Sequence, residues 1–456
     1  MPEQNPNPVY RPGASAAAEQ PRILLTATLR WPIAARLAMA FSELGCRVEA
    51  LCPRGHPVTH TRAATRVHFH DALRPLRALR AALLETMPDL VIPCDDEAAV
   101  QLHRLHAGCI ATEPADRALS ALIERSLGNP GACALATTRG PLLALAAELG
   151  IRVPHTTAAA TAQALDAWLS RHALPAVIKI DGSWGGRGVA ITHSRDEAHD
   201  AFARLSSRPA LRHALARALL DRDLAPLRSS LRHDAPPVTL QDHVSGHPAN
   251  RAVACWHGKV LAGTSVEALC TQQATGPATV VRVIDNAEMD EAVRRLVERL
   301  GLTGLWGVDF VIEAATGAAF LIEVNPRATP ITHLALGPGR DLPAALLSAL
   351  GGLSAHAPRE PIDRSVIALF PGEWQRDLAS EHLQRAHHDI PWTEPALVRD
   401  GLLRPWAERG WVARSWARVR ARPRRAAPAP PCASEQTQTD CSHYNPMAPH
   451  VRKGMK

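Results

Sequence analysis

Two acidic residues and one amide in the C-terminal half of the chain have the types and spacing of a cation site. Asp309 lies in Gly307-Val308-Asp309-Phe310, and Glu323 and Asn325 lie in Leu321-Ile322-Glu323-Val324-Asn325-Pro326-Arg327. Because side chains alternate along a strand, Glu323 and Asn325 point to one face, and a preceding strand can place Asp309 beside them. Mg²⁺ prefers such oxygen ligands and shares its shell with substrate phosphates. The sequence therefore predicts a magnesium site, with an ordinary edge hairpin of solvated polar face as the structural alternative.

The elements that must position these residues are two strands and a turn. Residues 305–313 are β-rich, Ala315-Thr316-Gly317 is a turn signal, and residues 319–324 are apolar again. Arg327 follows directly, and its planar guanidinium can bind a phosphate as a fork. We therefore predict a hairpin that carries the cation ligands and ends in a phosphate-binding arginine.

A glycine-rich loop between two short strands is the second chemical feature. The strand Ala176-Val177-Ile178-Lys179-Ile180 leads into Asp181-Gly182-Ser183-Trp184-Gly185-Gly186-Arg187-Gly188, and a second strand follows. Glycines let a backbone approach an anion and aim its N–H groups at it, and Lys179 adds a point charge. The loop is not a Walker loop, because no Gly-Lys-Ser/Thr opens a helix, and it is not a dinucleotide fingerprint, because a strand and not a helix follows. It predicts a flap over phosphate, with a plain hairpin turn as the alternative; the glycines in question are Gly182, Gly185, Gly186 and Gly188.

Together these features resemble the ATP-grasp enzymes. Their last metal-binding strand reads Glu-x-Asn-Pro-Arg, as residues 323–327 do here, with an acidic residue about one hairpin earlier. The resemblance implies that Asp309, Glu323 and Asn325 hold two Mg²⁺ ions that bridge the ATP phosphates, with Mn²⁺ as a substitute. It also implies that Lys179 and Arg327 act in catalysis, Arg327 by steadying the transferred phosphoryl group.

Two further segments extend the resemblance to the nucleotide. Arg139 precedes a helix over 141–149 and the exit Gly150-Ile151-Arg152-Val153-Pro154, which is similar to the start of ATP-grasp domains, where a basic residue contacts phosphate. A solvated helix cap is the alternative for Arg139. The stretch 238–246 resembles the hinge that grips adenine, and Asp242 is one candidate for binding ribose because Pro248 replaces the usual carboxylate. The hinge residues so implied are Gln241, Asp242, His243 and Val244.

The N-terminal third alternates strands with helices. Residues 22–27, 46–51 and 89–93 are apolar strands, and 33–44 is an amphipathic helix, which favours a parallel sheet. Ligands of such sheets bind at the carboxyl ends of strands, although acidic residues there also suit a helix first turn. The candidate substrate contacts are Thr26, Thr28, Asp95, Asp96 and Glu97.

The predicted fold class is α/β and α+β. A Rossmann-like (pre-ATP-grasp) parallel sheet precedes a two-lobed ATP-grasp domain and a helical, partly disordered C-terminal tail. The predicted limits are 1–20 disordered, 21–125 first domain, 129–353 ATP-grasp domain with a helical excursion over 194–234, 354–420 helical extension, and 421–456 disordered basic, proline-rich tail. Within the extension we expect helices over 374–388 and 395–420.

Composition bounds the function classes. The chain has 456 residues, of which 46% are hydrophobic and only 4% aromatic, so a globular core is expected and a stacking-based nucleic-acid binder is not. Residues 1–20 do not resemble a signal peptide, and no apolar run approaches the ~20 residues of a membrane span. We expect a cytoplasmic protein without a specific nucleic-acid partner; a homodimer stays open.

The implied activity is that of a carboxylate–amine ligase. ATP and Mg²⁺ would activate a small-molecule carboxylate as an acyl phosphate for attack by an amine or other nucleophile, releasing ADP and phosphate. The chain looks closest to the carbamoyl-phosphate synthetase and biotin carboxylase branch, but residues 265–279 lack the histidine of the bicarbonate enzymes, which favours a larger carboxylate. The alternatives are an ATP-dependent phosphotransferase and a non-catalytic nucleotide-binding protein.

Overall fold

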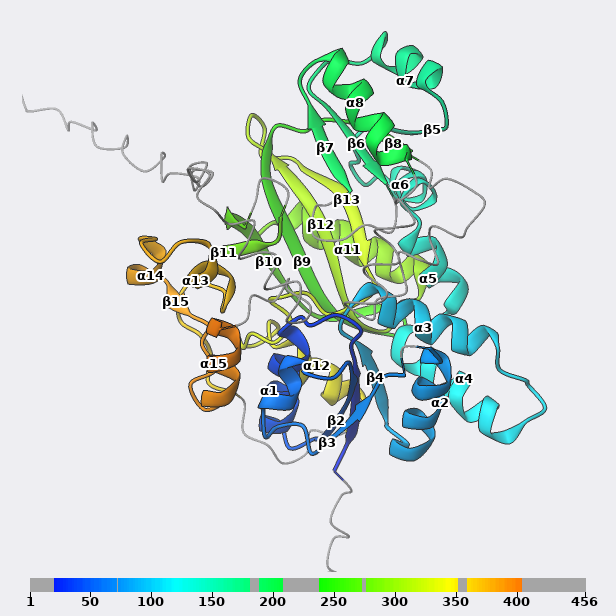
Figure 1. Cartoon of the computed structure of the whole chain (residues 1–456), viewed down its shortest axis with the longest axis vertical. Helices are drawn as coiled ribbons and strands as arrows, with labels where there is room; N and C mark the ends of the chain where they lie inside the picture. The colour runs from blue at the N-terminus through cyan, green and yellow to red at the C-terminus, as the bar shows by residue number, and fades with distance from the viewer. Residues whose placement is uncertain are drawn as a thin grey trace, which may run out of the picture.

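Three β-sheets organise the chain in the computed structural model (Figure 1). The structure describes residues 20–71, 73–180, 188–207, 238–272, 276–351 and 359–403. The predicted tail 421–456 and segment 1–19 lie outside these residues. Among the described residues, no helix combines the length and apolar character needed to cross a bilayer.

The N-terminal sheet is parallel, with strand order β3-β2-β1-β4. Both β1 and β4 are apolar and mostly buried, as parallel strands covered on both faces are. The predicted parallel sheet is thereby confirmed. Its elements are β1 (Arg22–Thr26), α1 (Ile33–Glu43), β2 (Arg47–Cys52), the 3₁₀ helix η1 (Pro57–His60), β3 (Arg66–Phe69), α2 (Pro75–Thr86), β4 (Leu90–Pro93), α3 (Asp96–Ala107) and α4 (Pro114–Leu127).

A small antiparallel sheet forms the upper lobe in Figure 1. Its order is β5-β8-β6-β7, and two helices cover one face through a core that includes Leu165, Trp168, Phe202 and Leu240. Only α8 of the predicted helical excursion falls among the described residues. The elements are β5 (Thr156–Ala159), α7 (Ala162–Leu169), β6 (Ala176–Ile180), β7 (Val189–Thr192), α8 (Arg195–Ser206) and β8 (Val238–Asp242).

A seven-stranded sheet lies between the small lobe and the N-terminal sheet, with order β13-β12-β9-β10-β11-β14-β15. Helix α11 packs on one face, and α12 packs on the other between this sheet and α1. Two further helices, α5 (Pro130–Thr137) and α6 (Arg139–Glu148), pack against β13. The remaining elements are β9 (Gly246–Trp256), β10 (Lys259–Thr271), β11 (Ala278–Ile284), α11 (Ala287–Leu300), β12 (Gly304–Glu313), β13 (Ala319–Asn325), α12 (Leu342–Ala349), β14 (Val366–Ala368) and β15 (His387–His388).

The C-terminal extension is not continuously helical. The helix predicted over 374–388 is replaced by α13 (Gly372–Arg376), α14 (His382–Arg385) and strand β15, and α15 spans Pro395–Leu403. Tertiary contacts override the local pattern: Thr279 Oγ1 donates to Glu373 Oε2 at 2.7 Å, and β14 pairs with β11 and β15. The extension thus completes the large sheet.

A buried polar cluster joins three parts of the molecule. Arg36 of α1 pairs with Asp389 of the extension and donates from Nε to His333 Nε2 at 3.2 Å. His333, in the loop after β13, lies 3.0 Å from both oxygens of Asp389. Burial lowers the pKa of His333, although Asp389 opposes that effect. Since buried charges are stable only when paired, the cluster fixes the extension against both other parts.

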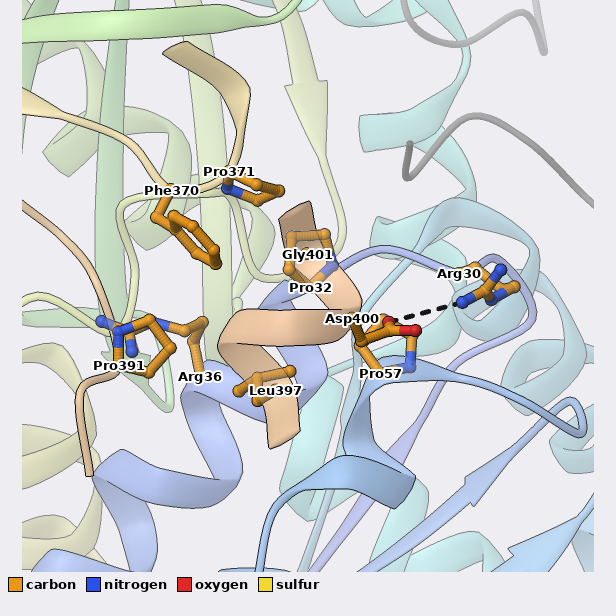
Figure 2. Close-up of a pocket in the computed structure, with 10 residues that line it drawn as sticks. All are labelled: Arg30, Pro32, Arg36, Pro57, Phe370, Pro371, Pro391, Leu397, Asp400 and Gly401. Atoms are coloured by element: carbon orange, nitrogen blue, oxygen red, sulfur yellow. Dashed lines mark hydrogen bonds and ion pairs between the residues drawn. The ribbon is translucent and has the colours of Figure 1, made fainter. Parts of the chain in front are cut away.

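A small cavity remains beside this cluster, where α15 crosses the start of α1 (Figure 2). Arg30 and Asp400 form an ion pair of 3.4 Å at its edge, and Pro32, Phe370 and Pro391 line it. Its volume of about 20 Å³ suffices for a single water molecule. The cavity therefore belongs to the packing of the extension.

Candidate nucleotide and metal site

The hairpin β12–β13 brings the three predicted cation ligands together. Asp309 stands directly opposite Glu323, and Asn325 Nδ2 donates to Asp309 Oδ2 at 2.8 Å. The pairing shifts by one residue beside Asp309, because Phe310 pairs with Leu321 and leaves Ile322 unmatched. Such bulges re-aim side chains near functional sites. Asp309, Glu323 and Asn325 consequently share one end of the sheet.

Asn250 is a fourth polar residue at this position, and our sequence reasoning missed it. Strand β9 pairs Asn250 with Asp309, and Asn250 Nδ2 donates to Asp309 Oδ1 at 2.6 Å. Thr329 Oγ1 donates to Asn250 Oδ1 at 3.4 Å. The sequence offers only a weak signal for a functional role, namely that Asn250 is an amide just before the apolar run of β9. Its contact with Asp309 becomes visible only through the pairing of β9 with β12. The cation set therefore spans three adjacent strands.

The electrostatics of the set favour a cation. Burial and the facing Glu323 carboxylate raise the pKa of Asp309 to about 6, although Asn250, Arg327 and Asn325 oppose the shift. Two carboxylates in directly paired positions repel each other, and a divalent ion with oxygen ligands relieves that repulsion. The donor set fits Mg²⁺ on this ground. As placed, Asn325 accepts from Arg327 Nη2 at 3.2 Å through Oδ1, so that oxygen would be shared with or yielded to the ion.

The raised pKa of Asp309 predicts a pH-dependent stability of the metal-free protein. The folded value of about 6 exceeds the ordinary 3.8, so the contribution is fully present below pH 3.8 and is lost as pH rises to about 6. Asp309→Asn keeps the shape and removes the titration. An asparagine can accept from only one of Asn250 and Asn325, so we expect a constant cost, on top of which the stability difference shifts in favour of the variant by roughly 1–3 kcal/mol as pH rises from 3.8 to about 6. Denaturant unfolding at several pH values, with a chelator, measures it; parallel curves for the two proteins would contradict the assignment.

Arg139 joins this site from α6. It is buried, and its Nη2 donates to Glu323 Oε2 at 2.9 Å, across 184 positions of sequence. A solvated helix cap, which was the alternative for Arg139, is therefore excluded. The contact places a fixed positive charge next to the Glu323 carboxylate.

Arg327 lies between the large sheet and the N-terminal sheet. Its Nε donates to Asp96 Oδ1 at 2.9 Å, and its guanidinium carbon lies 4.8 Å from the centre of the Trp31 ring. Although burial disfavours its charge, Asp96, Asp309 and Glu323 raise the pKa of Arg327. The loop after β13 packs closely against Gly307 of β12. A Cβ at residue 307 would lie 2.1 Å from Thr329 Cγ2, so only glycine allows this contact. Arg327 is thus a rigidly held cation beside the carboxylates.

Lys179 and Gln241 meet in the small lobe. Lys179 Nζ donates to Gln241 Oε1 at 2.6 Å, and Gln241 Nε2 donates to Thr156 Oγ1 at 3.0 Å. Lys179 and Gln241 are both buried, and their strands are antiparallel neighbours. Two residues that were assigned to the nucleotide by separate motifs therefore touch.

We expect Lys179→Met to weaken ATP binding at least about tenfold, because a buried ammonium is lost from the strand that leads into the predicted flap. Methionine keeps the length and apolar stem of the side chain, so the fold should be retained, although the lost bond to buried Gln241 should cost about 1–3 kcal/mol of stability. Calorimetric titration with ATP and Mg²⁺ tests this, with Lys259→Met in the exposed β9–β10 turn as the matched control. Unchanged ATP affinity in Lys179→Met would remove the lysine from the site.

The predicted flap is only partly described. Strands β6 and β7 flank it as expected, and Gly188 closes it through a bond from Ile180 N to Gly188 O of 3.0 Å. Gly182, Gly185 and Gly186 lie outside the described residues.

Asp242 lies apart from Lys179 and Gln241. It follows Gln241 on β8 and so points to the opposite, helix-covered face, where its Oδ1 lies 2.7 Å from His172 Nδ1. His243 and Val244 follow in the link to β9 and are half-buried. Burial, with His193 nearby, lowers the pKa of His243. The hinge residues are thus divided between two faces of the small sheet.

The acidic residues that follow β4, Asp95 and Asp96, make different contacts. Asp95 is fully buried and caps α3 by accepting from Ala98 N at 2.9 Å, while it also accepts from Thr28 N, Thr28 Oγ1 and Leu29 N. These bonds use both carboxylate oxygens, so Asp95 and Thr28 hold the loop rather than face a substrate. Thr26 is buried within the strand. Asp96 reaches the candidate site through Arg327, whereas Glu97 accepts from Gln101 Nε2 within α3 at 3.3 Å.

Comparisons with known proteins agree with this geometry. A model of the ATP-grasp domain matches residues 228–330, which contain Gln241 and the proposed cation ligands. No curated protein sequence gives a significant match.

Solved structures share the fold at low identity. Carboxyaminoimidazole ribonucleotide synthase from Aspergillus clavatus, complexed with ATP, is 15% identical and aligns over 76% of this chain and 80% of its own, with a TM-score of 0.53. The biotin carboxylase domain of Hydrogenobacter thermophilus 2-oxoglutarate carboxylase, in complex with MgADP and bicarbonate, is 15% identical over 75% and 71%, with a TM-score of 0.51. N5-carboxyaminoimidazole synthetase from Staphylococcus aureus, complexed with ADP, is 14% identical over 73% and 77%, with a TM-score of 0.50. The chain therefore contains an ATP-grasp domain, and its fold is similar to the folds of these enzymes.

Proposed function

We propose that this protein is an ATP- and Mg²⁺-dependent ligase. It would activate a small-molecule carboxylate as an acyl phosphate for attack by an amine or another nucleophile, and would release ADP and phosphate. The observation that carries this proposal is the facing pair Asp309 and Glu323, with Arg139 bonded to Glu323 and Arg327 bonded to the neighbouring Asn325. Such a group of opposed charges suits phosphoryl transfer between two anions.

The chemistry follows from the charges. A carboxylate oxygen of the substrate attacks the γ-phosphorus, the bond from that phosphorus to the bridging oxygen breaks, and ADP leaves. Bound Mg²⁺ would neutralise charge on the phosphate oxygens. Arg139, Lys179 and Arg327 supply fixed positive charge from three different elements. The nucleophile then attacks the acyl carbon and phosphate departs.

The substrate carboxylate would enter from the N-terminal sheet. Arg327 is held there by Asp96 at the start of α3 and lies over Trp31 in the loop after β1. This is the carboxyl edge of the parallel sheet, where ligands of such sheets bind. The absence of a histidine from residues 265–279 supports a carboxylate larger than bicarbonate.

The spent nucleotide tests the proposal. A screen of amino acids and other small carboxylates, each with an amine donor, should identify a pair that releases ADP and phosphate. Chromatography that shows AMP and pyrophosphate instead would overturn the acyl-phosphate route. ADP release that needs one co-substrate only would identify a phosphotransferase, and no turnover with any pair, together with tight ATP binding, would favour a nucleotide-binding protein without catalysis.

A further inference from the structure

Two histidines and an aspartate meet on the helix-covered side of the small lobe. They are His155, just before β5, His172, after α7, and Asp242, at the end of β8. One possible ligand atom from each lies within 4.8 Å of the other two. Our proposed function uses neither histidine, and Asp242 points away from Lys179 and Gln241. The cluster therefore requires an explanation of its own.

The backbone fixes the three residues relative to one another. Asp242 N donates to His155 O at 3.0 Å, which continues the antiparallel pairing of β5 with β8. His172 is packed against Trp168, with the two rings nearly parallel and their centres 4.2 Å apart. The rings of His155 and His172 are 4.5 Å apart and tilted by 33°. The pairing of β5 with β8 and the ring stacking hold the ligand atoms near one another. This arrangement does not depend on an ion bound between them.

We propose that His155, His172 and Asp242 form a binding site for a divalent transition-metal ion of the Zn²⁺ class. Imidazole nitrogens suit Zn²⁺ and its neighbours, whereas Mg²⁺ and Ca²⁺ take oxygen ligands. Tetrahedral Zn²⁺ with bonds of about 2.0–2.1 Å needs its ligand atoms about 3.3 Å apart. The present ligand atoms lie within 4.8 Å of one another, so the exposed His155 side chain would have to move toward His172 and Asp242 to reach that spacing.

The site differs in chemistry from the set around Asp309. That set offers carboxylate and amide oxygens alone, whereas this one offers two nitrogens and one carboxylate. With three protein ligands, a fourth position faces solvent beside the exposed His155. The bound ion would draw Asp242 into its own shell and would tie α7 and β5 to the end of β8, directly before His243.

The plain alternative is an ordinary hydrogen-bonded His–Asp pair with a second histidine stacked nearby. The small lobe provides a matched control for this alternative. His199 of α8 lies 2.9 Å from Asp166 of α7 in a similar pair, and the described residues place no further metal-binding side chain in a group with it. A pair of this kind should bind Zn²⁺ weakly, because it lacks the third ligand.

Titration of the full-length protein with Zn²⁺, in the presence of millimolar Mg²⁺, tests the proposal. We expect His155→Ala and Asp242→Asn each to lose one equivalent of bound Zn²⁺, or at least about tenfold in affinity for it. His199→Ala should keep the wild-type stoichiometry. His155 is exposed, so its replacement should leave the fold intact. Circular dichroism spectra of the variant and the wild type serve as the control for folding.

Co²⁺ provides an independent readout. The wild-type protein should show the intense visible absorption of a four-coordinate Co²⁺ ion, and His155→Ala should lose it. Equal Zn²⁺ stoichiometry and affinity in the wild type, His155→Ala and Asp242→Asn would overturn the proposal, as would loss of the same equivalent in His199→Ala. None of these measurements depends on ATP turnover, so the result is independent of the proposed ligase activity.

Discussion

Glu323→Gln should lower Mg²⁺-dependent ATP turnover by a factor of about 10²–10³, the cost of losing one preorganised charge at a phosphoryl-transfer site. Glutamine preserves the length of the side chain and can still accept from Arg139 Nη2 through its amide oxygen. The substitution therefore removes the charge of the proposed metal ligand with little structural change. Loss of that charge also removes its repulsion of the Asp309 carboxylate, which partly causes the raised pKa of Asp309.

Turnover of ATP with the carboxylate found by the screen measures this effect, and a titration of Mg²⁺ at fixed ATP shows whether the metal requirement has weakened. Glu313→Gln is the matched control, because Glu313 ends β12, the partner strand in the same hairpin, and accepts a hydrogen bond from Thr316 at the exposed turn. Turnover within about threefold of wild type in Glu323→Gln would exclude the metal assignment, provided that the variant unfolds at the wild-type temperature.

Arg327→Lys should lower kcat by a factor of about 10²–10³ while the KM for ATP changes much less. Lysine keeps the charge but has no planar fork, so it cannot hold Asp96 and Asn325 while it also reaches a phosphate. The guanidinium is stacked over Trp31, and an ammonium would not reproduce that contact equally. The expected loss falls on the chemical step because Arg327 stands at the junction with the N-terminal sheet.

Steady-state kinetics with varied ATP separates the two parameters. Arg294→Lys serves as the control, because Arg294 forms only exposed ion pairs with Glu291 and Glu298 on α11. A raised KM for ATP with unchanged kcat would show that Arg327 contributes to ground-state binding alone.

Local pattern was sufficient for the hairpin and for the flap strands. The hairpin predicted from 305–313 and 319–324 is β12 and β13 within a residue or two, and the strand predicted at 176–180 is β6. Alternation along β13 was enough to place Glu323 and Asn325 on one face. Where the position of a side chain depends on residues nearby in the sequence, the alternation of apolar residues and the turn residues are enough to predict it.

Long-range pairing could not be read from the sequence. Asn250 meets Asp309 only because β9 lies between β12 and β10, and Arg139 meets Glu323 only because α6 packs against β13. Asp242 was assigned to the nucleotide with Gln241 because residues 238–246 resemble the adenine hinge, and the structure places the two side chains on opposite faces of β8. The prediction of a continuous helix over 374–388 was wrong for the same reason. The local structure there depends on a long-range contact, the hydrogen bond from Thr279 on β11 to Glu373.

The pairing of β14 with β11 has a practical consequence for anyone who shortens this protein. Strand β11 is a run of mostly apolar, β-branched residues, and β14 covers its outer edge. A fragment that ended near residue 353 would retain the candidate nucleotide residues but would leave this edge open as a template for neighbouring chains. Such a fragment should aggregate during expression, so recombinant versions are best ended after α15 rather than at the apparent end of the ATP-grasp domain.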